Sequence, residues 1–378
     1  MQLTILQKNL HQGLNTISHI AEKNLSIPIL NNILIKAKDN IITLAATNLE
    51  IGITKQIRGK IIKEGTTTVD AKIFSDYIAL LPNEKIDIQL VNKQDLKINC
   101  EKYNTVIKGQ NSEDFPVIPQ IDKKISLTLS VSDLKIALNQ LLFAINPTDS
   151  RLELTGILFD INDKNINLVS TDSFRLAKKE INFCLCSGTM DSNGLKIIVP
   201  LKTMQELARI INFPNDELTE DSDQIQIHIA DNQILFVYQG VEMVSRLIEG
   251  HYPDYIQVIP TNFKTEIIID RGEFLRAIKM ASIFSANSNA VDLTINTDQQ
   301  QIIVEAVSGQ IGSHQAKLAA KINGQDNSIR LNYRYLLDCL NVLSANQISF
   351  KIIDDVSACK ITLPGSEEYQ YIVVPLRK

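Results

Sequence analysis

Histidine and cysteine, which often bind metals or act as nucleophiles, are few and scattered in this chain. The five histidines stand at positions 11, 19, 228, 251 and 314. His11 and His19 form the only close pair. Eight residues apart on a helix, they would lie roughly 12 Å apart, too far to share one metal without a third ligand. We therefore predict two surface histidines rather than a metal site.

The five cysteines form an odd, scattered set, which favours reduced thiols over a disulfide framework. They are Cys100, Cys184, Cys186, Cys339 and Cys359. Cys184 and Cys186 would face the same side of a strand, because one residue separates them. A zinc site of this type needs a second pair of ligands, which the sequence lacks.

The other candidates for catalysis are also incomplete. Thr171-Asp172-Ser173 sets hydroxyls beside an acid, but no histidine is near in sequence to activate them. The run DELTEDSD at Asp216 to Asp223 has five carboxylates without the spacing or glycine of a calcium loop, so we expect a solvated acidic loop. The phosphate-binding loop and the HExxH and GxSxG motifs are missing. We predict a non-catalytic protein without a cofactor, with an enzyme of unrecognised site as an alternative.

The elements that hold these residues recur three times, with a period of roughly 125 residues. Amphipathic helices open at Leu6, Val131 and Asp270, and each is followed by alternating strands and a second helix. Proline-bearing stretches, DFPVIPQ and HYPDYIQVIP, mark the boundaries. The predicted domains are residues 1–125, 126–252 and 253–378.

Helical periodicity places Leu6, Leu10, Leu14, Ile17 and Ala21 on one face of the first helix. The second helix of that repeat stops at Pro82, and the later helices are expected at 132–146, 201–212, 271–285 and 331–344, the last capped by Asn332. Between the helices, a period of two predicts half-buried antiparallel strands. Each repeat is therefore predicted to be α+β, with two helices covering one face of antiparallel sheet.

Composition excludes several classes of protein. The chain has 378 residues, a net charge of −5 and 44% hydrophobic residues, which suits two to four folded domains. Neither a secretory leader nor an apolar run near the ~20 residues of a membrane span occurs. We expect a cytoplasmic protein with no membrane partner. The acidic balance argues against binding nucleic acid over the whole surface.

The expected helices reverse the sign of the overall charge. They carry nine basic residues, namely Lys8, Lys72, Lys135, Lys202, Arg209, Arg271, Arg276, Lys279 and Arg334. They carry six acids, namely Glu22, Asp76, Asp133, Glu206, Glu273 and Asp338. Solvated helix faces explain this small excess as well as contact with phosphates does.

Several segments, in their order and spacing, resemble the bacterial sliding clamp family, the beta subunit of DNA polymerase III, over essentially the full length. They are SIPILNNILI at 26–35, TNLEIGI at 47–53, EDFPVIP at 113–119, TDSFRLA at 171–177, IIVPLKTMQEL at 197–207, GHYPDYIQVIP at 250–260 and the tail YIVVPLRK. The resemblance implies a non-catalytic processivity factor with the DNA clamp fold. A ring-shaped, head-to-tail homodimer would encircle double-stranded DNA without reading its sequence, and an ATP-driven clamp loader would place it there.

The resemblance also implies which residues meet the DNA and the second subunit. The DNA-facing residues would be Lys8, Lys72, Lys135, Lys202, Arg209, Arg276, Lys279 and Arg334. At the dimer interface, Ile107 on an edge strand would face Ile283 and Phe284 of the other chain. Thr105 stands near a position where the family often has an aromatic residue, so this interface would be less apolar here.

The resemblance further implies a pocket for short linear motifs of the replicative DNA polymerase, the clamp loader, other polymerases and repair proteins. Its lining would be Leu154, Thr171, Phe174, Arg175, Leu176, Pro253, Val258, Val356, Ile372, Val373, Val374, Pro375, Leu376 and Arg377. This chain departs from the family at Ser173, Phe174, Gln257, Val374 and Leu376. The last two replace methionines, so we expect a more rigid pocket. A clamp-like scaffold that uses this pocket without being loaded on DNA is the alternative.

Overall fold

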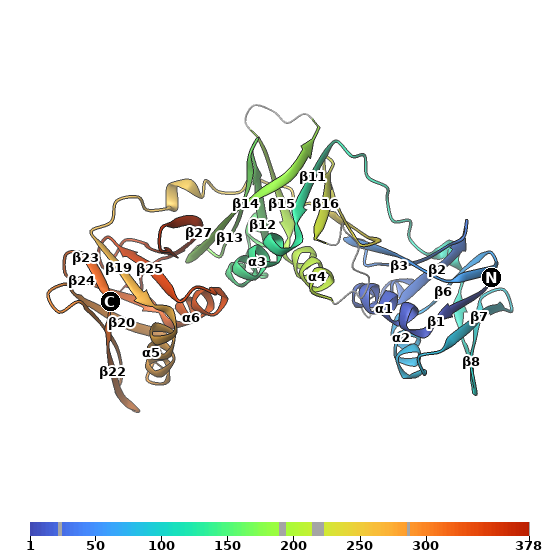
Figure 1. Ribbon diagram of the computed structural model, residues 1–378, viewed down its shortest axis with the longest axis horizontal. Helices are drawn as coiled ribbons and strands as arrows, with labels where there is room; N and C mark the ends of the chain where they lie inside the picture. Colours follow the sequence, from blue (N-terminus) through green and yellow to red (C-terminus); the bar gives the residue numbers. More distant parts are fainter. Residues whose placement is uncertain (22–24, 189–193, 214–222, 286–287, 378) are drawn as a thin grey trace. The chain divides into compact units, whose positions relative to one another are not determined.

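The chain folds into two units of α-helices and antiparallel strands (Figure 1). The computed structural model describes residues 1–21, 25–188, 194–213, 223–285 and 288–377. The predicted acidic loop therefore lies outside the described residues, except for Asp223. The first unit contains Met1–Val131, Cys184–Thr189 and Glu206–Leu247, and the second contains Ser132–Phe183, Met190–Gln205 and Ile248–Lys378.

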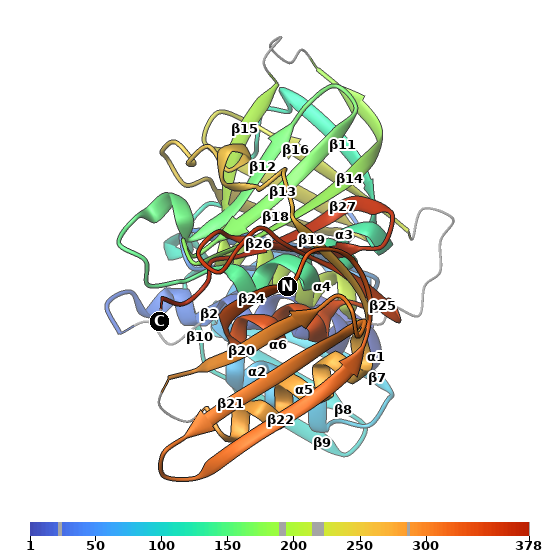
Figure 2. The same cartoon turned by 90° about the vertical axis from the view of Figure 1, so that its left-hand side faces the viewer.

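All six predicted helices are present. They are α1 (Gln7–Ile17), α2 (Ala71–Leu80), α3 (Val131–Leu141), α4 (Leu201–Asn212), α5 (Arg271–Ile283) and α6 (Tyr333–Val342). Short 3₁₀ turns extend α1 over Ser18–Ile20 and α3 over Leu142–Ala144, so both α-helices end earlier than the periodicity predicts. Helices α1 and α2 pack together in the first unit (Figure 1), and α5 and α6 do so in the second (Figure 2).

Two antiparallel sheets build the first unit. One has the strand order β5 (Lys60–Lys63), β1 (Gln2–Leu6), β7 (Lys85–Val91), β8 (Asp95–Cys100) and β9 (Tyr103–Ile107). The other follows consecutive pairings through β10 (Gly109–Gln110), β6 (Gly65–Asp70), β2 (Asn32–Lys38), β3 (Ile41–Thr47), β4 (Ile51–Ile57), β18 (Val241–Arg246), β17 (Gln233–Tyr238), β16 (Gln224–Ile229) and β11 (Ile125–Ser130).

The second unit repeats this plan. One run of pairings leads through β15 (Leu195–Pro200), β12 (Gly156–Ile161), β13 (Asn165–Thr171), β14 (Arg175–Ser187), β27 (Ser366–Val373), β26 (Cys359–Leu363), β25 (Gln347–Ile352), β19 (Thr265–Asp270) and β23 (Lys321–Gly324). A separate sheet has the order β22 (Gly312–Ala319), β21 (Gln301–Ser308), β20 (Ala290–Asn296) and β24 (Asn327–Asn332).

The element order divides the chain into three similar repeats: β1 to β10 with α1 and α2, β11 to β18 with α3 and α4, and β19 to β27 with α5 and α6. The fourth strand of one repeat pairs with the last strand of the next, β4 with β18 and β14 with β27. In the part of the chain that the structure describes, β22 and β9 each pair on one side only. These two strands are the fourth strand of the third repeat and the last long strand of the first.

Side chains at the helix ends fix the helix pairs. Asn332 caps α6 as predicted, since its side chain accepts a hydrogen bond from the Arg334 backbone nitrogen at 3.0 Å. The first residue of α1, Gln7, donates from Nε2 to the Ile78 carbonyl in the last turn of α2, at 2.8 Å. Arg271 at the start of α5 donates in the same way to the Leu340 carbonyl of α6, at 2.8 Å. These bonds add a side-chain donor to carbonyls in the last turn of the second helix, of which Ile78 also accepts from the Leu81 backbone nitrogen at 3.3 Å.

The buried face of α1 follows the predicted spacing at Leu10, Leu14 and Ile17. Leu6 is an exception: it is the last residue of β1 and is exposed, so the helical pattern begins one residue later than the sequence suggests. Gly13 lets α1 approach the sheet, because a Cβ there would lie 2.7 Å from Cγ2 of Ile57.

None of the helices in the described ranges is both long enough and apolar enough to cross a membrane.

Candidate functional site

A cavity of about 140 Å³ opens in the second unit, where β14 and β27 pair. It is lined by Arg151, Leu154, Thr171, Ser173, Arg175, Leu176, Tyr252, Pro253, Tyr255, Val258, Ile372 and Val374. The structure thus brings together a subset of the predicted pocket: Leu154, Thr171, Arg175, Leu176, Pro253, Val258, Ile372 and Val374. Its floor is a buried apolar cluster that includes Leu158, Val169 and Ile198.

The other predicted pocket residues do not line the cavity. Val373 is fully buried, as expected for a strand residue that faces away from its neighbour Ile372. Phe174 and Val356 are 61% and 73% exposed outside the cavity. The lining also excludes Pro375, Leu376 and Arg377, and the backbone nitrogen of Leu376 donates to the Arg330 carbonyl at 2.8 Å.

Two tyrosines that are absent from the predicted pocket also line the cavity. Tyr255 donates from its hydroxyl to Oδ2 of Asp160 at 2.9 Å, and Tyr252 donates to the Val169 carbonyl at 3.4 Å. Burial raises the pKa of both phenols, and the hydrogen bond with Asp160 adds to the effect at Tyr255. Both rings therefore stay neutral and suit an apolar wall. The motif HYPDYIQVIP already contained them, and their amphipathic character was the available signal.

Arg151 and Ser173 form a polar rim, of which the sequence motifs indicated Ser173, as a departure from the family, but not Arg151. The Arg151 guanidinium donates to the Ser173 hydroxyl, and Ser173 has a positive φ of 76° in the turn after β13. The side chains come from segments 22 residues apart, so spacing gave no signal for the contact.

Arg175 is anchored on several sides. Its guanidinium donates to Asp172 Oδ2 at 3.0 Å, to Asp338 Oδ2 at 2.5 Å and to the Phe143 carbonyl at 2.7 Å. It also lies over the ring of Tyr335, 4.5 Å from the centroid. Asp172 and Phe143 belong to the central repeat, whereas Asp338 and Tyr335 belong to α6 of the third. The side chain therefore joins two repeats as well as lining the cavity.

The charge on Arg175 is compatible with this burial. Burial opposes the charge, but the oxygen atoms of Tyr371, Asp338 and Asp172 hold the pKa of the guanidinium above its usual value. The pair with Asp172 has both side chains close to 90% buried. Loss of the arginine would leave the buried Asp172 carboxylate poorly solvated, whereas Asp338 is 41% exposed to water.

The basic residues of the helices fall into two groups. Lys8, Lys72, Lys202, Arg276, Lys279 and Arg334 have exposed side chains, and Lys135 is half-buried. Arg209 differs, because its guanidinium donates to the Asn15 and Thr16 carbonyls at the end of α1 and to Glu206. It is half-buried and holds α4 to α1 within the first unit. A phosphate would have to compete with these bonds for its donors.

The predicted subunit contact needs one correction. Ile107 is only 7% exposed and points into the first unit, so it is not a surface residue. Its neighbour on β9, Val106, is 49% exposed and presents the apolar side chain of this edge. Alternation along a strand explains the error, since one position changes the face.

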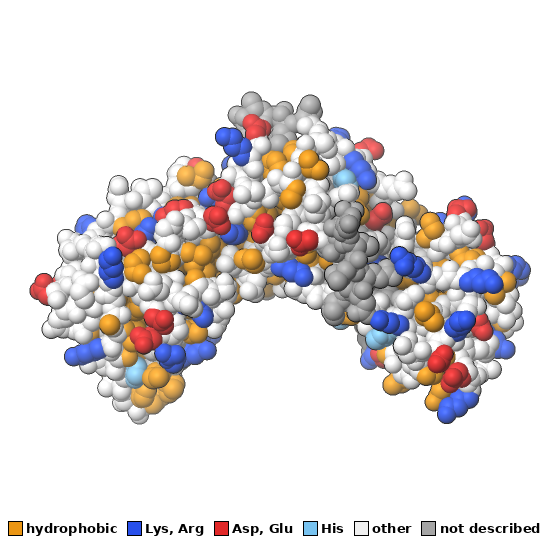
Figure 3. Space-filling view, viewed as in Figure 1, with side chains coloured by type: hydrophobic (Ala, Val, Ile, Leu, Met, Phe, Trp, Pro, Cys, Tyr) orange, Lys and Arg blue, Asp and Glu red, His pale blue; other side chains and the backbone are white. Residues whose placement is uncertain are grey.

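The third repeat carries the other half of the predicted contact. Ile283, at the end of α5, is 64% exposed. Phe284 stacks on His314 of the edge strand β22, with ring centroids 6.0 Å apart. On the face shown in Figure 3, hydrophobic side chains gather beside a histidine at the free end of this repeat.

A metal centre finds no support: among the described residues, no group of three or more His, Cys, Asp or Glu side chains could hold an ion. Cys184 is exposed and Cys186 is half-buried, and both are free thiols.

Replacing Arg175 tests its role as a link between repeats. We expect Arg175→Met to lower the free energy of unfolding by about 2 kcal/mol, because two carboxylates lose their partner. Arg175→Lys should recover part of this loss, since lysine keeps the charge but not the forked geometry. Urea unfolding followed by circular dichroism measures both. The control is Arg330→Met, whose pair with Asp292 is more exposed and should contribute under 1 kcal/mol. Equal losses at the two sites would contradict the assignment.

Comparison with known proteins accounts for this arrangement. Family models of the DNA polymerase III beta subunit match residues 1–119 (N-terminal domain), 128–254 (central domain) and 256–377 (C-terminal domain). The beta sliding clamp of Bacillus subtilis is 27% identical over 388 residues, covering 100% of both chains. That of Staphylococcus epidermidis is 26% identical over 387 residues, covering 100% of this chain and 99% of the relative.

Solved structures agree with this family. The DNA polymerase sliding clamp from Bacillus subtilis superposes with a TM-score of 0.92 at 26% identity, covering 100% of this chain and 99% of the other. A putative DNA polymerase III beta subunit from Eubacterium rectale gives a TM-score of 0.89 at 29% identity over 100% of both chains. The chain therefore belongs to the DNA polymerase III beta subunit family, the beta sliding clamps.

Proposed function

We propose that this protein is the processivity clamp of a replicative DNA polymerase, and that it carries no catalytic activity of its own. Membership of the beta sliding clamp family supports both parts of the proposal. We place its work in the cytoplasm, where a replication protein of this family would meet DNA and its polymerase. The domains are assigned as 1–125, 126–252 and 253–378, in keeping with the three family models.

The repeated pairing of strands between neighbouring repeats is the observation that supports a ring-shaped homodimer. Inside the chain, the fourth strand of a repeat pairs with the last strand of the next at two junctions, β4 with β18 and β14 with β27. Among the strands that end their sheets in the described part of the chain, β22 is the fourth strand of its repeat and β9 the last long strand of its own, so these two are the same kinds of strand. A second copy can pair its β9 with β22 by the same rule, in a head-to-tail contact. Two such contacts close a homodimer and leave no open edge for filaments.

Apolar side chains beside these edges suit the contact. Val106 extends from β9, and Ile283 and Phe284 lie at the end of α5, where Phe284 stacks on β22 through His314. Pairing of main chains contributes hydrogen bonds, while these side chains bury apolar surface.

Double-stranded DNA is the proposed occupant of the ring. The exposed Lys8, Lys72, Lys202, Arg276, Lys279 and Arg334 supply positive charge on the helices, with Lys135 half-buried among them. Long side chains of this kind contact phosphates without reading bases, which lets a ring slide. Arg209 takes a structural role in this proposal, because α1 carbonyls and Glu206 occupy its donors.

The cavity in the second unit is the proposed docking site for partner proteins. Its apolar walls and its polar rim at Arg151 and Ser173 suit a short peptide that carries Leu or Phe side chains. Such motifs would come from the replicative polymerase, the clamp loader, other polymerases and repair proteins. A clamp-like scaffold that is never loaded on DNA would use the same cavity, so only DNA retention separates the two functions.

Retention on circular DNA tests the clamp. After loading with an active clamp loader and ATP, the protein should co-elute with nicked circular duplex in gel filtration and should be lost when the circle is cut. A closed ring slides off an end, whereas ordinary affinity does not depend on ends. Equal retention on both forms would contradict the ring. No retention at all would favour the scaffold.

Charge reversal tests the DNA-facing helices. The triple change of Lys202, Arg276 and Lys279 to Glu should lower loading on nicked circles about tenfold or more, because six units of charge change beside phosphates. Sedimentation should still show a dimer. A matched triple change of Lys63, Lys85 and Lys93 to Glu, at exposed positions outside the helices, should load nearly as well as the unchanged protein. Equal loading by both variants would mean that these helices do not face DNA.

A valine pair tests the docking cavity. Val258 lines the cavity, whereas Val356 lies outside it, although both belong to the pocket that the family resemblance implies. Val258→Asp should weaken binding of a fluorescently labelled Leu- and Phe-containing peptide about tenfold, because a carboxylate would be desolvated in an apolar site. Val356→Asp should change affinity by less than about twofold. The reverse order would move the binding site away from the cavity.

A further inference from the structure

A second, larger groove lies entirely within the first unit. Its volume is about 600 Å³, and its walls come from α1, from β4 with the residues after it, from the end of α4, and from the turn between β17 and β18. We call it the α1–β4 groove. It is distinct from the docking cavity, which lies in the second unit.

The lining of the α1–β4 groove is polar and positive. Lys55 and Arg58 carry positive charge, and Asn9, Gln12, Asn40, Gln56 and Gln239 carry amides. Tyr238 and Phe213 supply two aromatic rings. None of the described residues that line the groove carries a carboxylate. This composition differs from the chain as a whole, in which acids outnumber bases by 43 to 38.

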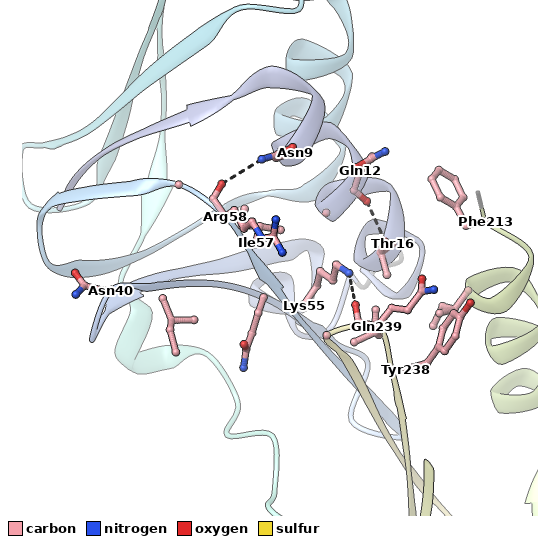
Figure 4. Close-up of a pocket in the computed structure, with 17 residues that line it drawn as sticks. Asn9, Gln12, Thr16, Asn40, Lys55, Ile57, Arg58, Phe213, Tyr238 and Gln239 are labelled. Atoms are coloured by element: carbon pink, nitrogen blue, oxygen red, sulfur yellow. Dashed lines mark hydrogen bonds between the residues drawn. The ribbon is translucent and has the colours of Figure 1, made fainter. Parts of the chain in front are cut away.

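The groove is elongated. Figure 4 shows Asn40 and Arg58 at one end, Tyr238 and Phe213 at the other, and Lys55, Gln12 and Thr16 between them. On α1, Asn9, Gln12, Gly13 and Thr16 follow one stripe at helical spacing, next to the exposed Lys8.

Backbone contacts keep the groove in shape. The turn between β17 and β18 contains Gln239 and Gly240 with positive φ of 47° and 72°, as a tight hairpin requires. This turn docks on β4, because Gln56 donates from its backbone nitrogen to the Gly240 carbonyl at 3.1 Å. Lys55 Nζ donates to the Gln239 carbonyl at 2.6 Å. The ammonium is thereby positioned in the groove.

The two aromatic side chains at one end of the groove can stack on flat groups, and the tyrosine can also donate a hydrogen bond. Phe213 is 36% exposed at the end of α4. Tyr238 is half-buried, and burial, with the charge of Asp223 second, raises the pKa of its phenol. Its hydroxyl therefore remains a hydrogen-bond donor at neutral pH.

We propose that the α1–β4 groove binds a single strand of nucleic acid. Arg58 and Lys55 would attract the phosphates, the amides would bond to base edges, and Phe213 with Tyr238 would offer faces for stacking. The described lining carries no carboxylate, which lowers the repulsion that an acidic chain otherwise imposes on DNA, and Asp223 is the acid that acts on the aromatic end. The inference deepens the proposed function, because it rests on DNA being the partner of this protein. It adds a site for an unpaired strand to the ring around a duplex.

An isosteric pair of variants tests the groove. Gln12→Glu places a negative charge in the groove without changing side-chain size, and Gln89→Glu makes the same change at an exposed position on β7 outside it. The probe is a fluorescein-labelled oligodeoxythymidylate of about 12 nucleotides, and fluorescence anisotropy measures its affinity for the full-length protein at low salt. Gln12→Glu should weaken binding about fivefold or more, and Gln89→Glu by less than about twofold.

Two further measurements locate the strand. Arg58→Gln should reduce the slope of log affinity against log salt by about 0.7, as expected for one lost phosphate contact on a single strand. A photoreactive halogenated pyrimidine in the oligonucleotide should crosslink to the peptides that contain Phe213 or Tyr238, as mapped by mass spectrometry.

The possible outcomes separate this inference from the proposed function. Equal affinity of the Gln12→Glu and Gln89→Glu variants, or crosslinks found only elsewhere, would overturn the strand site, even if the unchanged protein is retained on circular duplex. Binding of an acidic peptide in place of the oligonucleotide would overturn it as well. Failure of the unchanged protein to stay on circular duplex would instead count against the clamp.

Discussion

Pairing between the edges of neighbouring sheets is the constraint on which the rest of this structure depends. Every repeat presents one fourth strand and one last strand, and an unpaired strand edge invites association with another chain. The chain satisfies two junctions itself, through β4 with β18 and β14 with β27. A second copy of the chain can pair with the unpaired backbone groups at the edges of β9 and β22. The proposed ring would therefore assemble through the same kind of hydrogen bonding that joins the repeats.

Arg209 reinforces the junction between the first two repeats and Arg271 links the two helices of the third, so part of the positive charge on the helices serves packing. Arg209 donates hydrogen bonds to carbonyls at the end of α1 and to the Glu206 carboxylate. Arg271 donates to two carbonyls, one at the end of α6 and one after it. Both belong to the positive charge of the helices, and both donate to carbonyls at helix ends. The excess of basic over acidic residues available to a partner is therefore smaller than the sequence suggests. Binding by encirclement needs only modest affinity, so a small excess is sufficient for a ring.

Periodicity predicted the helices and the antiparallel strands because burial of one face dictates it locally. It failed where one position decides the outcome: Leu6 ends β1 instead of facing the core, and Ile107 points inward while Val106 points out. The candidate site depended on contacts distant in sequence. Arg175 meets Asp338 across 163 residues, and no local pattern reports such a contact. The tyrosines Tyr252 and Tyr255 stood in a motif that had been singled out, yet only packing shows that they form a wall.

The proposed docking cavity and the proposed subunit contact lie on different strand pairings. Leu176 on β14 and Ile372 on β27 are paired neighbours in one sheet, so the facing walls of the cavity come from a single chain. Arg175 adds a polar link between the same two repeats. Separation of β9 from β22 of another copy breaks neither the β14–β27 pairing nor the bonds of Arg175. The proposed ring would therefore open at its subunit contact while a partner peptide stays bound, because the contacts that hold the proposed peptide site are internal to each chain.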